Sequence, residues 1–172
     1  ASDTSGSVSF SIAFTDTAGN AGTAVTSGSG SVTSVIASLD TIAPTKSSVS
    51  IVSNNAITSV ANDGDVVTLT LTASEAINTP VVTFKSGGAS ITDTSVTYVN
   101  TSGNTWTADY TANANDTFGA VTFNIAYSDT AGNTAAAVTT TTNSSSVSFM
   151  PTPSAAFEPV KADIKSKMAA NA

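Results

Sequence analysis

Alternating apolar and polar residues run along most of the chain and predict β-strands. Near its start, Val8, Phe10, Ile12 and Phe14 are separated by single serine or alanine residues. This period of two places every second side chain on the same face of an extended strand. Similar stretches recur at residues 47–53, 66–73, 81–84, 95–99, 105–111, 121–128 and 135–142. No segment with helical periodicity joins them, which excludes a parallel α/β fold.

Turn-forming residues separate these strands at short intervals. Residues 54–55, 62–65, 87–88 and 102–104 consist mostly of Asn, Asp and Gly, which tight turns prefer. About seven strands in about a hundred residues, with turns every 8–12 positions, are typical of an immunoglobulin-type sandwich. We therefore predict an all-β fold of immunoglobulin-like β-sandwich repeats. We expect the single tryptophan, Trp106, to be buried against the opposite sheet.

The chain contains the same segment twice. Residues 3–26 and 116–139 align without gaps at an offset of 113, and 15 of their 24 positions are identical. Each copy is predicted to be a β-hairpin, in which an alternating strand leads into the turn Asp-Thr-Ala-Gly-Asn and a second strand. Gly19 and Gly132 lie in these turns, where glycine accommodates a positive φ.

Only the second copy follows a long β-patterned stretch. We therefore interpret residues 1–40 as the C-terminal hairpin and linker of an incomplete repeat, and residues 41–149 as a complete repeat. A two-stranded hairpin alone is marginal in water because it cannot bury its apolar face. We expect Phe10, Ile12 and Phe14 to be assembly residues, which need a sheet from another copy of the chain or from an adjacent repeat.

Proline-containing segments flank the complete repeat. Pro44 restricts the backbone on both sides and predicts a stiff joint before the first strand. Residues 150–172 begin with a Pro-Thr-Pro linker and then lose the β pattern. Their apolar residues recur at spacings of three and four and predict a short amphipathic helical tail; they are Phe157, Val160, Ile164 and Met168.

Several motifs follow one another from residue 40 onward. They are DTIAPT at 40–45, SSVSIVSNN at 47–55, DGDVVTLTLTASEAI at 63–77, GNTWTADYT at 103–111 and VTFNIAYSDTAGN at 121–133. Their order resembles the bacterial and archaeal Ig-like repeats of large cell-surface proteins, such as biofilm adhesins and surface-layer proteins. The resemblance implies a sandwich fold and an extracellular location. It specifies no binding partner, because such repeats are often spacers and a fold does not fix a function.

Composition excludes several classes of function. The chain has five Lys and Arg against twelve Asp and Glu, for a net charge of −7. It lacks the basic cluster that neutralises phosphates, and we expect no nucleic-acid partner. The absence of Cys and His removes thiolate and imidazole chemistry. The acidic residues fit turns rather than a catalytic pair, so we expect no enzymatic activity. No run of about 18 apolar residues occurs, so we expect no membrane span.

Acidic residues in the turns and at the joint are candidate calcium ligands. Calcium takes six to eight oxygen ligands, and the resemblance implies calcium at the joints between repeats. The candidate ligands are Asp16, Asp40, Asp63, Asp65 and Asp129. However, Asp and Asn form turns without any metal, and Asp-Thr-Ala-Gly-Asn lacks the dense Asp spacing of a dedicated calcium loop. Calcium is the one cofactor candidate that the sequence offers.

Together these features predict a non-enzymatic structural or adhesive protein of the cell surface. We expect its Ig-like units to assemble into a filament, stalk or surface lattice, with other copies of itself or adjacent repeats of a longer chain as partners. The alternative is a carbohydrate- or receptor-binding module, for which one Trp and three Tyr provide little aromatic platform. A virion decoration or fibre protein is a further alternative.

Overall fold

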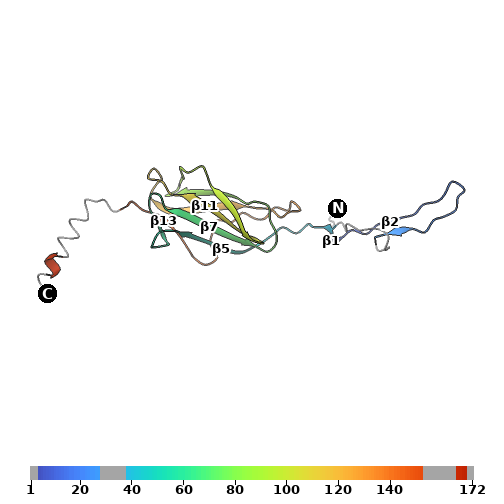
Figure 1. The fold of residues 1–172 in the computed structure, drawn as a ribbon, viewed down its shortest axis with the longest axis horizontal. Helices are drawn as coiled ribbons and strands as arrows, with labels where there is room; N and C mark the ends of the chain where they lie inside the picture. Colours follow the sequence, from blue (N-terminus) through green and yellow to red (C-terminus); the bar gives the residue numbers. More distant parts are fainter. Residues whose placement is uncertain (1–3, 28–37, 153–165, 170–172) are drawn as a thin grey trace. The chain divides into compact units, whose positions relative to one another are not determined.

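A computed structural model describes residues 4–27, 38–152 and 166–169. The chain divides into two compact units (Figure 1), an N-terminal unit at Ala1–Ala43 and a sandwich unit at Pro44–Ala172. Each unit is described by itself. Among the described residues no helix is long and apolar enough to cross a membrane.

The N-terminal unit consists of two small antiparallel ladders. Strand β2 (Ser11–Ile12) pairs with β3 (Val25–Thr26), and β1 (Gly6–Ser7) pairs with β4 (Ser38–Leu39). The predicted first hairpin therefore forms, with Ile12 opposite Val25. No described residue of this unit is fully buried, because two-stranded ladders have no second layer to cover their faces.

The sandwich unit contains two sheets (Figure 1). One has four antiparallel strands in the order β10-β11-β7-β5, and the other has five in the order β6-β13-β12-β8-β9. Only β13 and β6 run parallel to each other. The strands are β5 (Lys46–Ser53), β6 (Val60–Ala61), β7 (Val66–Ala73), β8 (Val81–Ser86), β9 (Ala89–Ser90), β10 (Thr97–Ser102), β11 (Thr105–Thr111), β12 (Gly119–Ala126) and β13 (Ser148–Phe149).

The core lies between the inner faces of these two sheets. Strand β7 shows the period of two directly, because Val67, Leu69 and Leu71 are at most 2% exposed while the threonines between them are half-buried. Phe84 of β8 and Tyr110 of β11 join the sheets through a ring contact of 4.7 Å between centroids. The predicted all-β fold is confirmed. Trp106, expected to be buried, is half-buried and packs against the margin of the core.

The last predicted strand, residues 135–142, is wrong as a continuous element. Val138 still exchanges two backbone hydrogen bonds with Ile125 of β12. The chain then leaves that sheet, and Thr142 bonds the backbone of Val49 on β5. Ser145 accepts a hydrogen bond from Ile51 on the same strand. Residues 139–146 contain only Thr, Asn and Ser, so they have no apolar side chain to hold them over the core.

Little of the predicted C-terminal tail lies within the described residues. Residues 166–169 form one short helical turn, in which Met168 is 71% exposed. The other three apolar positions of the predicted stripe, Phe157, Val160 and Ile164, lie outside the described residues.

Candidate functional site

The hairpin of the N-terminal unit, residues 8–26, exposes a row of large apolar side chains and is hereafter called the exposed hairpin. Phe10 is 43% exposed, Ile12 57% and Phe14 54%, and Val8 beside them is 50% exposed. These include the three assembly residues that the alternating pattern predicts. Single exposed apolar residues are ordinary, but a contiguous row marks a surface that gains free energy when it is covered.

The second copy of the same hairpin, residues 121–139, is seated in the core of the sandwich unit and is hereafter called the buried hairpin. Phe123 is 8% exposed, Ile125 0% and Tyr127 6%. Residues 121–126 of β12 pair with β8, so that Phe123 lies opposite Phe84. The same sequence pattern is thus covered in one unit and uncovered in the other.

The two copies of Asp-Thr-Ala-Gly-Asn fold in the same way. The Oδ1 atom of Asp16 accepts the N–H of Asn20 at 2.8 Å and its Oδ2 atom accepts the Asn20 side-chain amide at 2.8 Å. Asp129 and Asn133 make the same two bonds, both at 2.8 Å. Because the Asp side chain satisfies the donors of its own turn, the motif specifies its conformation locally.

These hydrogen bonds lower the pKa of both carboxyl groups. For Asp16 the main cause is the side-chain amide of Asn20, followed by its backbone N–H. For Asp129 burial raises the pKa, but the hydrogen bonds from Asn133, Gly132 and Ala131 together outweigh it and the net direction is downward. The charged form of Asp129 therefore stabilises the sandwich unit.

We predict that acid destabilises the sandwich unit partly through Asp129. Since its folded pKa is lowered, its contribution is present above the unfolded value of about 3.9 and is lost as the pH falls through the folded pKa. The melting temperature, followed by Trp106 fluorescence, should therefore fall more steeply below about pH 4 in the wild type than in Asp129→Asn. Asp16→Asn, which changes the same motif in the other unit, should leave this profile unaltered. Parallel profiles for the wild type and Asp129→Asn would contradict the assignment.

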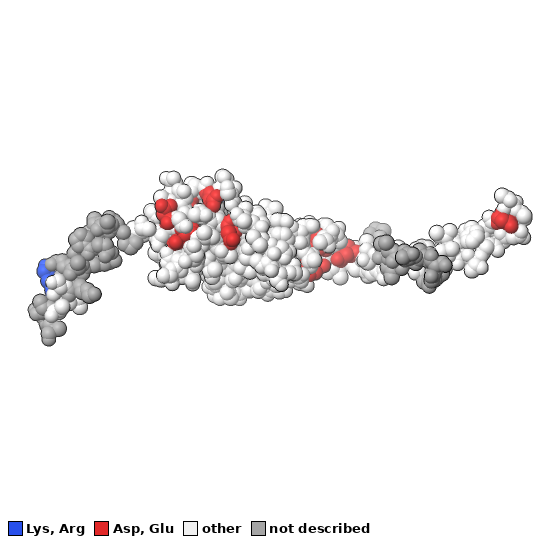
Figure 2. Space-filling model, in the orientation of Figure 1, with Lys and Arg blue, Asp and Glu red and all other residues white. Residues whose placement is uncertain are grey.

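Asp63 and Asp65 lie in a turn before β7, where their carboxylates also accept hydrogen bonds from backbone N–H groups. The Oδ2 atom of Asp65 accepts the N–H of Asn62 and the side-chain amide of Asn55, both at 2.7 Å. Asp63 accepts the N–H of Ala114 at 2.8 Å. Figure 2 shows acidic side chains gathered at the end of the sandwich unit where β13 lies. Asp65 is thus held by its own turn, and Asp63 by the loop that contains Ala114.

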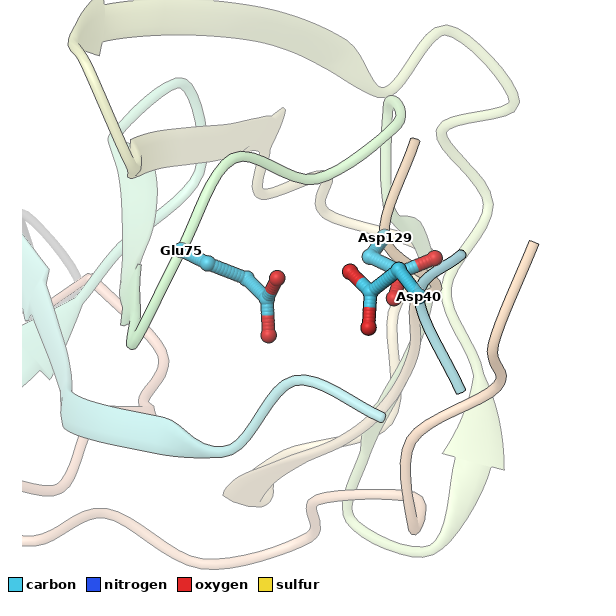
Figure 3. A group of neighbouring side chains, drawn as sticks. All are labelled: Asp40, Glu75 and Asp129. Atoms are coloured by element: carbon cyan, nitrogen blue, oxygen red, sulfur yellow. The ribbon is translucent and has the colours of Figure 1, made fainter. Parts of the chain in front are cut away.

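A second acidic pair lies at the other end of the sandwich unit. The carboxylate oxygens of Glu75 and Asp129 come within 4.8 Å of each other (Figure 3). Glu75 follows the end of β7 and Asp65 precedes its start, so eight strand residues, or about 25 Å, separate the two ends. Asp129 therefore lies close to Glu75 and far from Asp65. Asp40, also drawn in Figure 3, belongs to the N-terminal unit, where its Oδ1 atom accepts the N–H of Ile42.

The calcium hypothesis predicts a gain of stability on metal binding at one of these ends. At 100 times its dissociation constant, a bound ion adds about 2.7 kcal/mol to the free energy of unfolding. That gain raises the melting temperature by several degrees over the value in a chelator. Glu75→Gln should abolish the increase if calcium binds beside Asp129, and Asp65→Asn should abolish it if calcium binds at the other end. Equal melting temperatures of the wild type in calcium and in chelator would rule calcium out.

Three features of the sandwich unit are not predictable from the sequence pattern. Glu75 is close to Asp129 only because β7 and β12 end at the same side of the sandwich. Asp116 is 5% exposed and joins two loops, although only its place in the repeat distinguishes it in the sequence. An open hollow of about 560 Å³ lies on the outer face of the five-stranded sheet, where it is lined by Thr83, Lys85, Thr122, Phe123, Asn124 and Thr139.

These lining residues are far apart in the sequence, and only strand pairing places β8 and β12 side by side. Their outward positions are predictable from the period of two, but their neighbours are not.

The chain matches no protein-family model, no curated protein and no solved structure.

Proposed function

We propose that the chain is a non-enzymatic structural protein of the cell surface, in which Ig-like sandwich units assemble into a filament, stalk or lattice. The observation that carries the proposal is the hairpin that occurs twice. In one copy Ile125 is 0% exposed, and in the other the equivalent Ile12 is 57% exposed. A protein that repeats a core element and leaves one copy uncovered is suited to join further polypeptide.

The strand order supports the Ig-like part of the proposal. Taken by their order across the sheet, strands β5, β7, β11 and β10 correspond to strands A, B, E and D of an immunoglobulin sandwich, and β8, β12 and β13 correspond to C, F and G. The four-stranded sheet has the neighbours A-B-E-D. The five-stranded sheet contains the neighbours C-F-G together with two short strands, β6 and β9.

The use of the acidic groups supports a structural role over a catalytic one. The carboxylates of Asp65, Asp116 and Asp129 accept hydrogen bonds from the backbone of their own turns. Such bonds hold loops in place and leave fewer lone pairs for proton transfer or for a substrate. Glycoside hydrolysis, by contrast, requires two carboxyl groups on either side of the bond that is cleaved.

Immunogold electron microscopy of cells that produce the protein tests the proposal. An antibody raised against the sandwich unit should label regular structures outside the cell, along a filament or across a surface layer. Pre-immune serum provides the control for background labelling. Label confined to the cytoplasm would contradict the proposed location, and diffuse extracellular label without any regular structure would contradict the structural role.

A carbohydrate-binding module is the second candidate, and the hollow on the outer face of the five-stranded sheet favours it. Threonine hydroxyls, Asn124 and the ammonium of Lys85 line an open space of about 560 Å³, which is within the range of small-ligand sites. Binding of a surface oligosaccharide, measured by calorimetry, should be lost in Lys85→Ala and in Asn124→Ala. Thr107→Ala, on the other sheet, is the matched control. Equal affinity in all variants would exclude this site.

A further inference from the structure

We infer that the exposed hairpin completes a second sandwich with a partner that carries a free front half, meaning a polypeptide segment with the strand pattern of residues 44–115. The inference rests on the proposed function and specifies the partner that covers the exposed hairpin. Its template is the buried hairpin, which the same chain already seats on such a segment. Neither a ligand nor a second exposed hairpin reproduces that template.

The template shows what the partner must supply. Strand β12 of the buried hairpin pairs with β8, so that Phe123 lies opposite Phe84 and Ile125 opposite Val82. Strand β8 therefore provides both a hydrogen-bonding edge and inward apolar side chains, since Val82 and Phe84 are at most 6% exposed. Strand β7 of the opposite sheet closes the core over them with Val67, Leu69 and Leu71.

The exposed hairpin lacks these two elements. Its strand β2 pairs with β3 on one edge, and within the described residues no strand pairs with the other edge. The face that β7 would cover carries Phe10, Ile12 and Phe14, each at least 43% exposed. An unpaired edge and an uncovered face on the same strand are the two features that strand addition followed by sheet packing would satisfy.

The exposed hairpin already has the register that a sandwich requires. Ile12 pairs with Val25 as Ile125 bridges to Val138, at the offset of 113 in both strands. Thr15 bridges to Ala21 as Ser128 bridges to Thr134. The N–H of Gly22 bonds the carbonyl of Phe14 at 2.9 Å, and that of Ala135 bonds the carbonyl of Tyr127 at 3.0 Å. Docking would therefore require little rearrangement of the hairpin, which lowers the cost of binding.

A second copy of the chain does not provide a free front half. Within each copy, six residues of β8 pair with residues 121–126 of that copy. Residues 1–172 thus contain two hairpins of this pattern and one front half. If two copies exchanged hairpins, one hairpin per copy would remain uncovered after any number of exchanges. The exposed hairpin is therefore covered by a front half that has no hairpin of its own, whether that segment is continuous with residues 1–172 or belongs to another polypeptide.

A chain extended by one front half tests the inference. Residues 44–115 are duplicated ahead of Asp3, so that residue 115 joins Asp3 as it joins Asp116 in the natural sequence. Because the chain has no Cys, Ile12→Cys provides a single thiol whose rate of modification reports exposure of the hairpin face. In the extended chain this rate should fall about 100-fold relative to the unextended 172-residue chain, since a thiol in a core reacts only after local unfolding. Val99→Cys, 46% exposed on β10, should react quickly in both chains.

A matched variant shows whether the thiol is protected by a new core or only by steric shielding from the added segment. Serine replaces Val82 and Phe84 in the added segment only, which removes its inward side chains and keeps its length. Ile12→Cys should then react as quickly as in the unextended chain. A thiol that stays reactive in the extended chain, whether or not the added segment folds, would overturn the inference.

The concentration dependence distinguishes the inference from self-association. If Ile12→Cys in the unextended chain becomes protected as its concentration rises, a second copy covers the hairpin and the inference is wrong. The proposed structural function would then still stand. If the immunogold label is absent from the cell surface, the proposed function fails, whereas protection in the extended chain would still define the partner of the hairpin.

Discussion

Ile125→Ala is expected to lower the free energy of unfolding of the sandwich unit by about 2–5 kcal/mol, the range for an aliphatic residue truncated in a close-packed core. Ile125 is 0% exposed, and it lies opposite Val82 on β8 while its backbone bonds Val138. Ile125 therefore lies where three strand segments meet. Removing its side chain leaves a cavity that the surrounding strands cannot fill without losing their register. The loss is a large part of the stability of a domain of this size.

The repeat provides the control for this prediction. Ile12 occupies the equivalent position in the exposed hairpin, where it is 57% exposed, and Ile12→Ala should change the same free energy by less than about 0.5 kcal/mol. Urea unfolding followed by Trp106 fluorescence measures both variants, because the only tryptophan of the chain lies in the sandwich unit. Equal losses in Ile12→Ala and Ile125→Ala would show that the exposed hairpin is part of the same folding unit, against the arrangement described.

Asp116→Ala is expected to cost the sandwich unit about 2–3 kcal/mol. The Asp116 side chain is 5% exposed. Its Oδ1 atom accepts the N–H and the hydroxyl of Thr92 at 2.7 and 2.8 Å, and its Oδ2 atom accepts the N–H of Asn113 at 3.0 Å. Alanine leaves two backbone donors without this partner, and each such loss costs about 1–3 kcal/mol where water cannot replace it fully. The two loops that Asp116 joins should also exchange their amide hydrogens faster.

Asp63→Ala is the matched control for Asp116→Ala. Asp63 also accepts a backbone hydrogen bond, from Ala114 at 2.8 Å, but its side chain is exposed. Water can take the place of its carboxylate, so the expected loss is about 0.5 kcal/mol or less. Hydrogen exchange at Thr92 and Asn113 distinguishes the two variants, since only Asp116→Ala removes their acceptor. An Asp116→Ala loss as small as that of Asp63→Ala would mean that water reaches the Asp116 site.

Local sequence signals predicted most strands because each strand carries its own pattern. Residues 66–73 and 105–111 were predicted with the boundaries that β7 and β11 have. Both are long and alternate apolar with polar residues, and both directly follow a turn residue, Asp65 or Asn104. The short strands β6, β9 and β13 were not predicted, since two residues contain no period. They exist only because a neighbouring strand offers them hydrogen-bonding partners.

The candidate site likewise has features that the sequence predicts and features that it does not. The turn geometry of Asp16 and Asp129 follows from the motif, because each Asp bonds to residues at most four positions away. The proximity of Glu75 to Asp129 does not, because it depends on how two strands from different sheets end. Equally, the pattern places residues 139–142 in a strand of the five-stranded sheet, but the hydroxyl of Thr142 instead bonds the backbone of Val49 on β5 of the other sheet.

The sequence by itself determined that the chain is all-β, that it contains one hairpin twice, and which side of each hairpin is apolar. These properties depend on alternation and on turns, which act over a few residues. The tertiary structure alone decided which apolar face is covered. Phe10 and Phe123 occupy the same position of the same motif, yet one is 43% exposed and the other 8%. The difference is that β8 pairs with the strand of Phe123, whereas no described strand pairs with the corresponding edge at Phe10, because burial depends on the surrounding strands and not on the residue that is buried.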